Sequence, residues 1–259
     1  MTQLLQGRYP PHLDREKDDT SLPGHIKPVR PMDVDGIVRD LMTPEERTRF
    51  RKLIRDMEEV PTTPKCRTFT QLPHRDLRLL QKVGFIRQLK GPQKQQTTMS
   101  VFRVPERHKN RARIIGWPKT FNDTLIYHAD MHLKEVQDIV SEVSPGTFAL
   151  AYDFTASFYQ LPLSPAAQRQ FVFAYRGRQY AWQVMVMGCA PAAEIMQRIS
   201  VAISRLPREL AAAITTSVHI DNVRYISSNK KALEQAAEII RARLATYGAT
   251  INETLDVTT

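Results

Sequence analysis

The chain has 259 residues, which is enough to bury the core of one large domain or of two modest ones. Hydrophobic residues make up 42% of it and charged residues 25%, as in ordinary globular proteins, and no apolar run approaches the roughly 18 residues that a membrane span needs. The N-terminus lacks the apolar core of a signal peptide. The only two cysteines, Cys66 and Cys189, have neither metal-binding nor disulfide-framework spacing, so we expect an intracellular protein.

The positive charge is concentrated in one segment. The formal net charge is +10, yet residues 65–120 alone carry 14 Lys and Arg against two acids, Asp76 and Glu106, a local excess of 14 − 2 = +12. The rest of the chain is therefore slightly acidic, at −2. A confined basic segment is typical of proteins that bind nucleic acid or polyphosphate, although a solvated basic face without a partner is the alternative.

In the first half of the chain we expect an irregular arm over residues 1–42, because Pro and Asp are frequent and periodicity is weak. A helix is predicted from Thr43, with Pro44 at its first position and Glu46 completing a capping box, and Pro61 and Pro64 ending it. A short helix over 73–83 is closed by Gly84. Two strands joined by a basic turn follow over 99–115.

In the second half, an apolar strand from Phe148 ends at Asp153, and a hairpin turns at Arg176-Gly177. A helix over 190–206, a hairpin over 215–227 and a helix over about 230–247, ended by Gly248, complete the chain. Because hairpin strands pair antiparallel among helices, the predicted fold class is α+β. We expect an N-terminal arm and helix over 1–64, a basic segment over 65–147 and a final domain over 148–259.

Two carboxylates follow strand-like runs, Asp153 after "TFALAY" and Asp221 after "TTSVHI". An acid at the end of a buried strand is costly unless it is paired or holds a cation. If the two strands are neighbours, both carboxylates could bind Mg²⁺, which prefers one or two carboxylates and completes its shell with water and phosphate oxygens. The alternative is that Asp221-Asn222 is simply a favourable polar hairpin turn.

The motifs resemble those of one protein family. "ALAYDFTASFYQLPLSPAAQRQFVFAYRGRQYAWQVMVMG" resembles motif A and the start of motif B of retroelement reverse transcriptases, and "SVHIDNVRYISSNKKALEQAAEIIRARLATYGATINE" resembles motifs C and D. Upstream, "LQKVGFIRQ" and "RARIIGWPKTFNDTL" resemble the fingers of this family. The resemblance covers residues 70–255 and is closest to the retrotransposon enzymes of gypsy-like, DIRS-like or VIPER-like elements. It implies a right-hand polymerase with an antiparallel sheet backed by helices and no thumb. The fingers would lie over residues 65–147, and the palm, with interleaved fingers elements, over residues 148–259.

The resemblance also implies roles for single residues. Asp153 and Asp221 would be the catalytic, metal-binding carboxylates, and the Phe154 carbonyl would be a further ligand of two Mg²⁺ ions, with Mn²⁺ as an alternative ion. Phe158 would be the steric gate that excludes ribonucleotides, although a core aromatic is the commoner role. The remaining implied contacts are the triphosphate contacts Lys109, Arg111 and Arg113, the motif B glycine Gly188 beside the nucleotide, and Gln197 on the template side.

The sequence departs from the family's pattern in four places. His219-Ile220-Asp221-Asn222 replaces the usual Tyr/Phe-x-Asp-Asp, and Asn222 binds a cation less strongly than an aspartate would. His219, which replaces the usual Tyr, is expected to be structural, with an approach to the primer end as the alternative. No lysine follows the Gly-x-x-x-Asn segment of motif D, and the Ala-Pro of motif B lies two residues nearer its glycine. The chain ends where a thumb would begin, so we expect either that the chain is a fragment or that another polypeptide supplies the thumb.

Three readings follow from these residues. The first is an RNA-directed DNA polymerase, a nucleotidyltransferase that extends a primer on an RNA or DNA template with dNTPs, weakened or inactivated by Asn222. The second is an inactive reverse transcriptase fold that binds RNA as a ribonucleoprotein scaffold. The third, an RNA-directed RNA polymerase, is disfavoured by Phe158.

Overall fold

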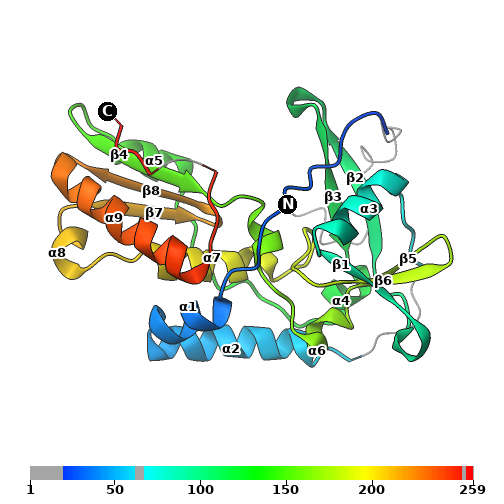
Figure 1. Ribbon diagram of the computed structural model, residues 1–259. Helices are drawn as coiled ribbons and strands as arrows, with labels where there is room; N and C mark the ends of the chain where they lie inside the picture. Colours follow the sequence, from blue (N-terminus) through cyan, green and yellow to red (C-terminus); the bar gives the residue numbers. More distant parts are fainter. Residues whose placement is uncertain (1–19, 62–66, 253–254, 259) are drawn as a thin grey trace. The chain divides into compact units, whose positions relative to one another are not determined.

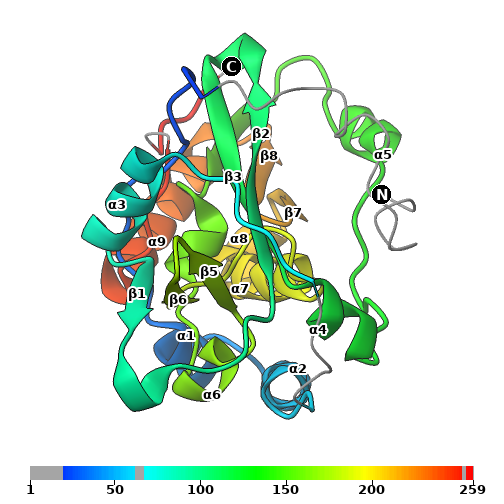
Figure 2. The same ribbon diagram turned by 90° about the vertical axis from the view of Figure 1, so that its right-hand side faces the viewer.

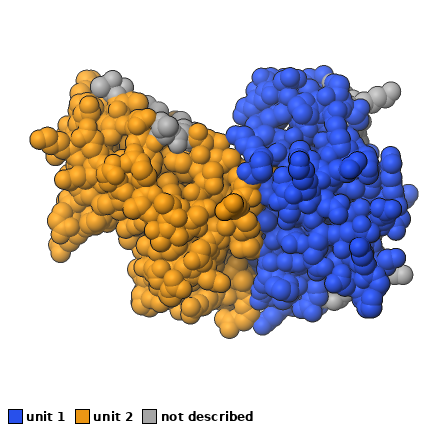
Figure 3. Space-filling view, in the orientation of Figure 1, with its two compact units in different colours: residues 1–28, 56–126, 163–190 blue, residues 29–55, 127–162, 191–259 orange. Residues whose placement is uncertain are grey.

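The computed structural model describes residues 20–61, 67–252 and 255–258, and they form two compact units. Unit 1 comprises residues 1–28, 56–126 and 163–190, and unit 2 comprises residues 29–55, 127–162 and 191–259 (Figure 3). The chain thus passes between the units five times, whereas the sequence predicts three successive segments with boundaries after residues 64 and 147. The difference arises because strands distant in the sequence pair within each unit.

Unit 2 contains a three-stranded antiparallel sheet in the order β4-β8-β7 (Figure 1). Its strands are β4 (Phe148–Asp153), β7 (Thr215–His219) and β8 (Asn222–Ser227). Side chains alternate between the two faces of such a sheet, and directly paired residues share a face. The pairs Leu150–Tyr225 and Tyr152–Val223 are buried on one face, so Asp153 and Asn222, which pair at the strand ends, lie on the other.

Two helices, α7 (Ala192–Ser204) and α9 (Lys230–Tyr247), pack against this sheet and against each other. The Tyr225 hydroxyl donates to the Ser204 carbonyl of α7 at 3.0 Å, which fixes the helix on the buried face. Asn229 caps α9 by accepting from the Ala232 N–H, and Gly248 ends it with a φ of +66°. The bounds of the helix and its closing glycine agree with the sequence prediction, which did not include the N-cap.

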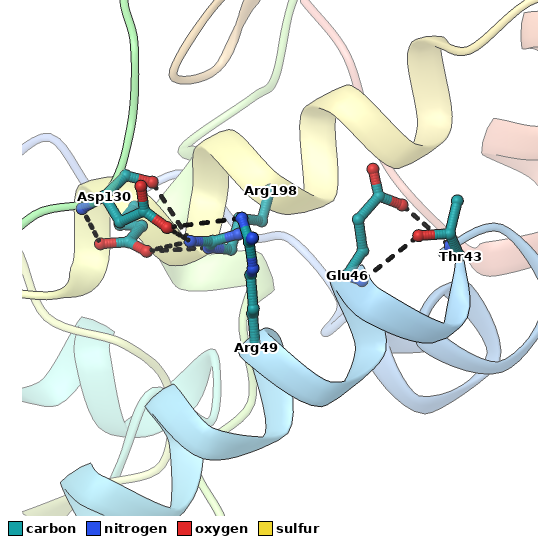
Figure 4. A network of polar contacts seen from close by, with 6 residues as sticks. Thr43, Glu46, Arg49, Asp130 and Arg198 are labelled. Atoms are coloured by element: carbon teal, nitrogen blue, oxygen red, sulfur yellow. Dashed lines mark hydrogen bonds and ion pairs between the residues drawn. The ribbon is translucent and has the colours of Figure 1, made fainter.

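The remaining helices of unit 2 are α1 (Val34–Asp40), α2 (Pro44–Glu58), α5 (Val136–Ser141) and α8 (Arg208–Ala211), although the last residues of α2 belong to unit 1. The predicted capping box of α2 is confirmed: the Thr43 N–H donates to Glu46 at 2.9 Å, and the Glu46 N–H donates to the Thr43 hydroxyl (Figure 4). Helix α1 was not predicted, because residues 1–42 were expected to be irregular. It is held by tertiary contacts, among them the bond from the Asp33 N–H to the Tyr247 carbonyl at 2.8 Å.

Unit 1 contains a three-stranded antiparallel sheet and a separate two-stranded ribbon. The sheet has the order β1-β6-β5, with strands β1 (Ile86–Leu89), β5 (Val172–Tyr175) and β6 (Arg178–Trp182). The predicted turn between β5 and β6 is confirmed, since Arg176 and Gly177 both have positive φ. The ribbon pairs β2 (Ser100–Glu106) with β3 (Arg111–Trp117) along their full length (Figure 2).

Short helices complete unit 1: α3 (His74–Lys82), α4 (Lys119–Thr124), α6 (Pro165–Gln168) and the 3₁₀ turns η2 (Gly91–Gln93) and η3 (Arg107–Lys109). The prediction of α3 and of its closing glycine is confirmed by Gly84, which has a φ of +80°. The second predicted stop of α2, Pro64, and the first nineteen residues of the arm lie outside the described residues. None of the helices in the described part of the chain is long and apolar enough to cross a membrane.

The described part of the arm runs beside β3 over residues 23–25. The His25 N–H donates to the Ala112 carbonyl at 2.7 Å, and the Ala112 N–H donates to the Pro23 carbonyl at 2.9 Å. Arg103, whose side chain is fully buried beside Asp76, donates to the Leu22 carbonyl. The arm therefore extends the β2–β3 ribbon by a third, short strand-like segment.

Candidate functional site

Three of the predicted site residues form one row across the sheet of unit 2. Asp153 on β4 pairs directly with Asn222 on β8, and Asn222 pairs directly with His219 on β7. Directly paired residues lie on the same face, so all three side chains are on the face opposite Tyr152 and Val223. His219 and Asn222 are exposed and Asp153 is half-buried, so this end of the sheet is accessible to a ligand.

Asp221 lies in the two-residue turn between β7 and β8, next to this row. The Phe154 N–H donates to the Asp221 carbonyl at 3.1 Å, which joins the end of β4 to the turn. The Ser157 hydroxyl donates to the Asp221 carboxylate at 2.7 Å. The strand before Asp221, β7, is not a direct neighbour of β4, because β8 lies between them. The strand after Asp221, β8, pairs with β4, and the two acids therefore stand at adjacent strand ends.

The turn is backbone-strained and held by α7. Ile220 has a φ of +59°, a conformation that β-branched residues rarely adopt. Its N–H donates to Oε1 of Gln197 at 2.5 Å, and Nε2 of Gln197 donates to the Val218 carbonyl at 3.2 Å. Gln197 is thus buried with both ends of its amide bonded to the hairpin. Its template-side role stays a prediction.

The turn of α7 that carries Gln197 is joined to neighbouring segments through Glu194 and Arg198. Glu194, which is 3% exposed, accepts from the Tyr127 hydroxyl at 2.8 Å and from Arg198 at 2.6 Å. Arg198 also pairs with Asp130 at 3.2 Å, and Arg49 of α2 lies 3.8 Å from the same carboxylate (Figure 4). A buried carboxylate requires hydrogen-bond partners, and those of Glu194 join this turn of α7 to the segment over residues 127–130.

The two phenylalanines of motif A differ in environment. Phe154 is 1% exposed and packs edge-on against Tyr152, with 5.6 Å between the ring centroids. Phe158 lies in the 3₁₀ turn η4 (Ser157–Gln160) and is half-buried. The residue before this turn, Ala156, has a φ of +47°. Because Phe158 is only half-buried, it is not a core residue. Its role as a steric gate stays a prediction.

Sequence reasoning missed the contact between motif D and Asp153. Nδ2 of Asn252 donates to Oδ2 of Asp153 at 3.0 Å, and the Asn252 N–H donates to the Asp153 carbonyl at 2.9 Å. The sequence contained a signal, because Asn252 ends the Gly-x-x-x-Asn segment. The partner could not be read from it, since 99 positions separate the two residues.

The predicted triphosphate contacts lie in unit 1, on and beside the β2–β3 ribbon. Arg111 and Arg113 share a face of β3, and both pair with Glu106 of β2, at 2.6 and 2.8 Å respectively. Burial alone would raise the pKa of the Glu106 carboxyl, but the hydrogen bonds from Arg111 and Arg113 outweigh it and lower that pKa. Lys109 is exposed in the turn η3.

Arg111 has a second partner in the arm. Its guanidinium nitrogen lies 2.8 Å from Nε2 of His25, and because a guanidinium can only donate, the imidazole nitrogen accepts. Burial and the neighbouring Arg111 both lower the pKa of His25, which favours the neutral ring that this contact requires. The arm therefore helps to fix one of the predicted phosphate-binding arginines.

The backbone conformation at position 188 in unit 1 requires a glycine. Its φ is +112°, and a Cβ built there would lie 2.6 Å from the Gly116 carbonyl oxygen. Asn122 spans this bend, donating to the Gly188 carbonyl and accepting from the Ala190 N–H, both at 2.9 Å. These contacts explain the glycine by packing alone, so its predicted place beside the nucleotide stays a prediction.

The residues at the sheet end suit a hard cation. Asp153 and Asp221 offer carboxylate oxygens and Asn222 an amide oxygen, the donor types that Mg²⁺ takes together with water and phosphate. Among the described residues, no group of three or more His, Cys, Asp and Glu side chains gathers as a metal site. Any ion here would therefore rely on two carboxylates and on its other ligands, which fits Mg²⁺ better than a metal held by a full protein cage.

The family model described as "Reverse transcriptase (RNA-dependent DNA polymerase)" matches residues 61–254. Among the curated proteins compared, none matches the chain in sequence.

Solved structures share the fold. A foamy viral protease-reverse transcriptase in complex with double-stranded DNA is 13% identical, with a TM-score of 0.62 over 88% of this chain and 44% of that one. Another, in complex with an RNA/DNA hybrid, is 14% identical, with a TM-score of 0.57 over 88% of this chain and 34% of that one. This chain thus spans less than half the length of either. The predicted α+β fold with palm and fingers is confirmed.

Proposed function

The chain belongs to the reverse transcriptase (RNA-dependent DNA polymerase) family, and from this premise we propose that it extends a primer on a nucleic-acid template with dNTPs. The RNA-directed reaction is the one the family description names, and the foamy viral relatives in the comparison bind double-stranded DNA and an RNA/DNA hybrid. The motifs resemble most those of the gypsy-like, DIRS-like and VIPER-like elements, so the proposed source is a retrotransposon of one of these types. The basic segment over residues 65–120 supplies the charge for the nucleic acid.

One observation carries the proposal: Asp153 and Asp221 stand at adjacent strand ends, joined by the hydrogen bond from Phe154 to the Asp221 carbonyl. Asp153 and Asp221, with the Phe154 carbonyl, would hold two Mg²⁺ ions, and Asn222 would offer a weaker oxygen. Bound there, the ions would lower the pKa of the primer hydroxyl and neutralise the charge of the leaving pyrophosphate.

The chain's own side chains would bind and orient the nucleotide. Arg113 and Arg111 would bind the triphosphate, for which planar guanidinium groups are suited, with Lys109 as a point charge nearby. Both arginines now donate to the carboxylate of Glu106. A bound triphosphate would take the place of this carboxylate as their anionic partner. The half-buried Phe158 would exclude a ribose 2′-hydroxyl by its bulk.

The test is primer extension on an RNA template with dNTPs, in Mg²⁺ and separately in Mn²⁺, beside Asp153→Asn. We expect extension by the wild type and a loss of about a thousandfold or more in the variant, because a catalytic carboxylate is removed. Extension that is much stronger in Mn²⁺ would identify Asn222 as the weak ligand. Equal extension by the wild type and the variant would refute the assignment of Asp153.

A second function is favoured by one observation: the place of the second motif C aspartate is taken by the neutral, exposed Asn222. With two acids only, the site would bind ions weakly, and the fold could serve as an RNA-binding scaffold. The same experiment separates the two functions. A scaffold would show no extension in either ion but tight, salt-sensitive RNA binding that Asp153→Asn leaves unchanged.

A further inference from the structure

Asn252 holds Asp153 from the side of the sheet opposite β8. We propose that Asn252 is the positioning residue of Asp153: its amide fixes one carboxylate oxygen and so sets the direction in which the carboxylate meets a divalent cation. The inference rests on the proposed function, in which Asp153 holds that cation.

The contact is made by both the backbone and the side chain of Asn252. The Asn252 N–H donates to the Asp153 carbonyl at 2.9 Å, and its side-chain Nδ2 donates to Oδ2 of Asp153 at 3.0 Å. Its remaining amide atom, Oδ1, accepts from the Thr155 hydroxyl at 3.0 Å. The side chain is thus held at both ends, and its rotation about the last torsion is blocked.

These contacts also settle the orientation of the amide. A carboxylate can only accept a hydrogen bond, so the NH₂ group of Asn252 must face Asp153, and the carbonyl oxygen must face the Thr155 hydroxyl. A flipped amide would place two oxygens against each other. The residue type therefore fits the position, because an amide can donate to a carboxylate and accept from a hydroxyl at once.

The backbone around Asn252 is fixed independently of its side chain. The Thr155 N–H donates to the Thr250 carbonyl at 3.0 Å, and Ile251 forms a β-bridge with Phe154. Gln160, which is fully buried, donates to the Thr155 and Thr250 carbonyls at 2.7 and 2.8 Å and accepts from the Thr250 N–H at 2.8 Å. Residues 250–252 thus run along the end of β4 as a short additional strand.

A neutral donor suits a cation-binding carboxylate better than a charged one. A lysine or arginine at this distance would itself neutralise Asp153 and compete with the ion, whereas an amide orients the carboxylate and leaves its charge in place. Asp221 has the corresponding arrangement, since the neutral Ser157 hydroxyl donates to it at 2.7 Å. Each of the two acids is therefore oriented by a neutral side chain.

The test measures Mn²⁺ binding to the full chain by electron paramagnetic resonance, with primer extension measured in parallel. The variants are Asn252→Ala and Asn252→Leu, beside Asp153→Asn and the control Asn229→Ala. The control removes another asparagine side chain, the cap of α9, and so also removes a hydrogen bond that stabilises the fold, without touching Asp153. Because the backbone bonds of residues 250–252 do not need the asparagine side chain, the variants should keep this segment in place.

We expect both Asn252 variants to bind Mn²⁺ about 10- to 100-fold more weakly than the wild type, as is usual when a partner of a metal ligand is removed. Extension should fall in parallel at low Mn²⁺ and recover at high Mn²⁺, which a merely destabilised protein would not do. The control should match the wild type in both measurements. If an Asn252 variant melts below the assay temperature, Thr155→Val is measured instead. This substitution removes the hydrogen bond to Oδ1 of Asn252 and so frees the same amide to rotate.

Two results overturn the inference in distinguishable ways. Unchanged Mn²⁺ affinity in the Asn252 variants, together with weakened affinity in Asp153→Asn, would overturn the role of Asn252 and leave the proposed function intact. Unchanged affinity in Asp153→Asn as well would overturn the metal site itself, and with it both the inference and the proposed function.

Discussion

At the scale of single residues, Glu106 occupies the two arginines that are proposed to bind the triphosphate. A nucleotide must displace it from Arg113, whose side chain is 43% exposed, before the guanidinium can bind phosphate. Such a partly exposed pair is worth about 0.5–1 kcal/mol. We therefore expect Glu106→Gln to lower the KM for dNTP about two- to fivefold, as measured by steady-state primer extension.

A suitable control for this prediction is Glu46→Gln. Glu46 also pairs with an arginine, Arg205 at 2.6 Å, but it belongs to the cap of α2. Its replacement should change stability and leave the KM for dNTP as it was. A higher KM in Glu106→Gln would contradict the competition and show that Glu106 orients Arg113 for the nucleotide.

At the scale of elements, the hairpin that carries Asp221 depends on a helix for its shape. Gln197 of α7 bonds to the Ile220 N–H and the Val218 carbonyl, and it thereby stabilises a turn whose Ile220 has a φ of +59°. Gln197→Ala leaves two backbone groups without this partner, so we expect the free energy of unfolding to fall by about 1–3 kcal/mol. Urea denaturation measures this change, and the extension rate should fall at unchanged KM for dNTP.

Gln81→Ala, at an exposed position of α3, is the matched control and should change neither quantity. The competing role of Gln197, a contact with the template, makes a different prediction. In that case the Gln197→Ala variant would be as stable as the wild type but would bind the template strand more weakly.

The elements that the sequence predicts well are those with a local cause. The capping box of Thr43 and Glu46, the Arg176-Gly177 turn and the end of α9 at Gly248 each depend on residues within a few positions. Helix α1 was missed because its stability comes from α9 and α7, far along the chain. The same reason explains the site: Asp153 and Asp221 stand out by their place after apolar strands, whereas Asn252 and Ser157 acquire a role only through their partners.

At the scale of the whole molecule, the division into units escapes sequence reasoning. Strand β1 pairs with β6, so that Ile86 lies opposite Trp182, and neither strand carries a local signal that names its partner. The chain consequently crosses between the units after residues 28, 55, 126, 162 and 190, in both directions. The basic segment over residues 65–120, by contrast, is evident from the sequence, and all of it belongs to unit 1.

From this uneven distribution of charge we predict how the whole chain binds nucleic acid. Cations that contact phosphates release bound counterions, so affinity for a single-stranded RNA should fall steeply with salt. With about six phosphate contacts, a rise from 50 to 200 mM NaCl should weaken binding about a hundredfold or more, as measured by fluorescence anisotropy.

The matched comparison is between two double variants. Lys90→Gln with Lys94→Gln removes two exposed charges from the basic segment, and Lys230→Gln with Lys231→Gln removes two exposed charges from α9. If Lys90 and Lys94 contact the RNA, the first variant lowers the slope of log affinity against log salt by about 1.4, since each single-strand contact contributes about 0.7. The second variant should keep the slope of the wild type, because its charges lie outside the segment. Equal changes in the two variants would mean that RNA responds to the net charge of +10 rather than to the segment over residues 65–120.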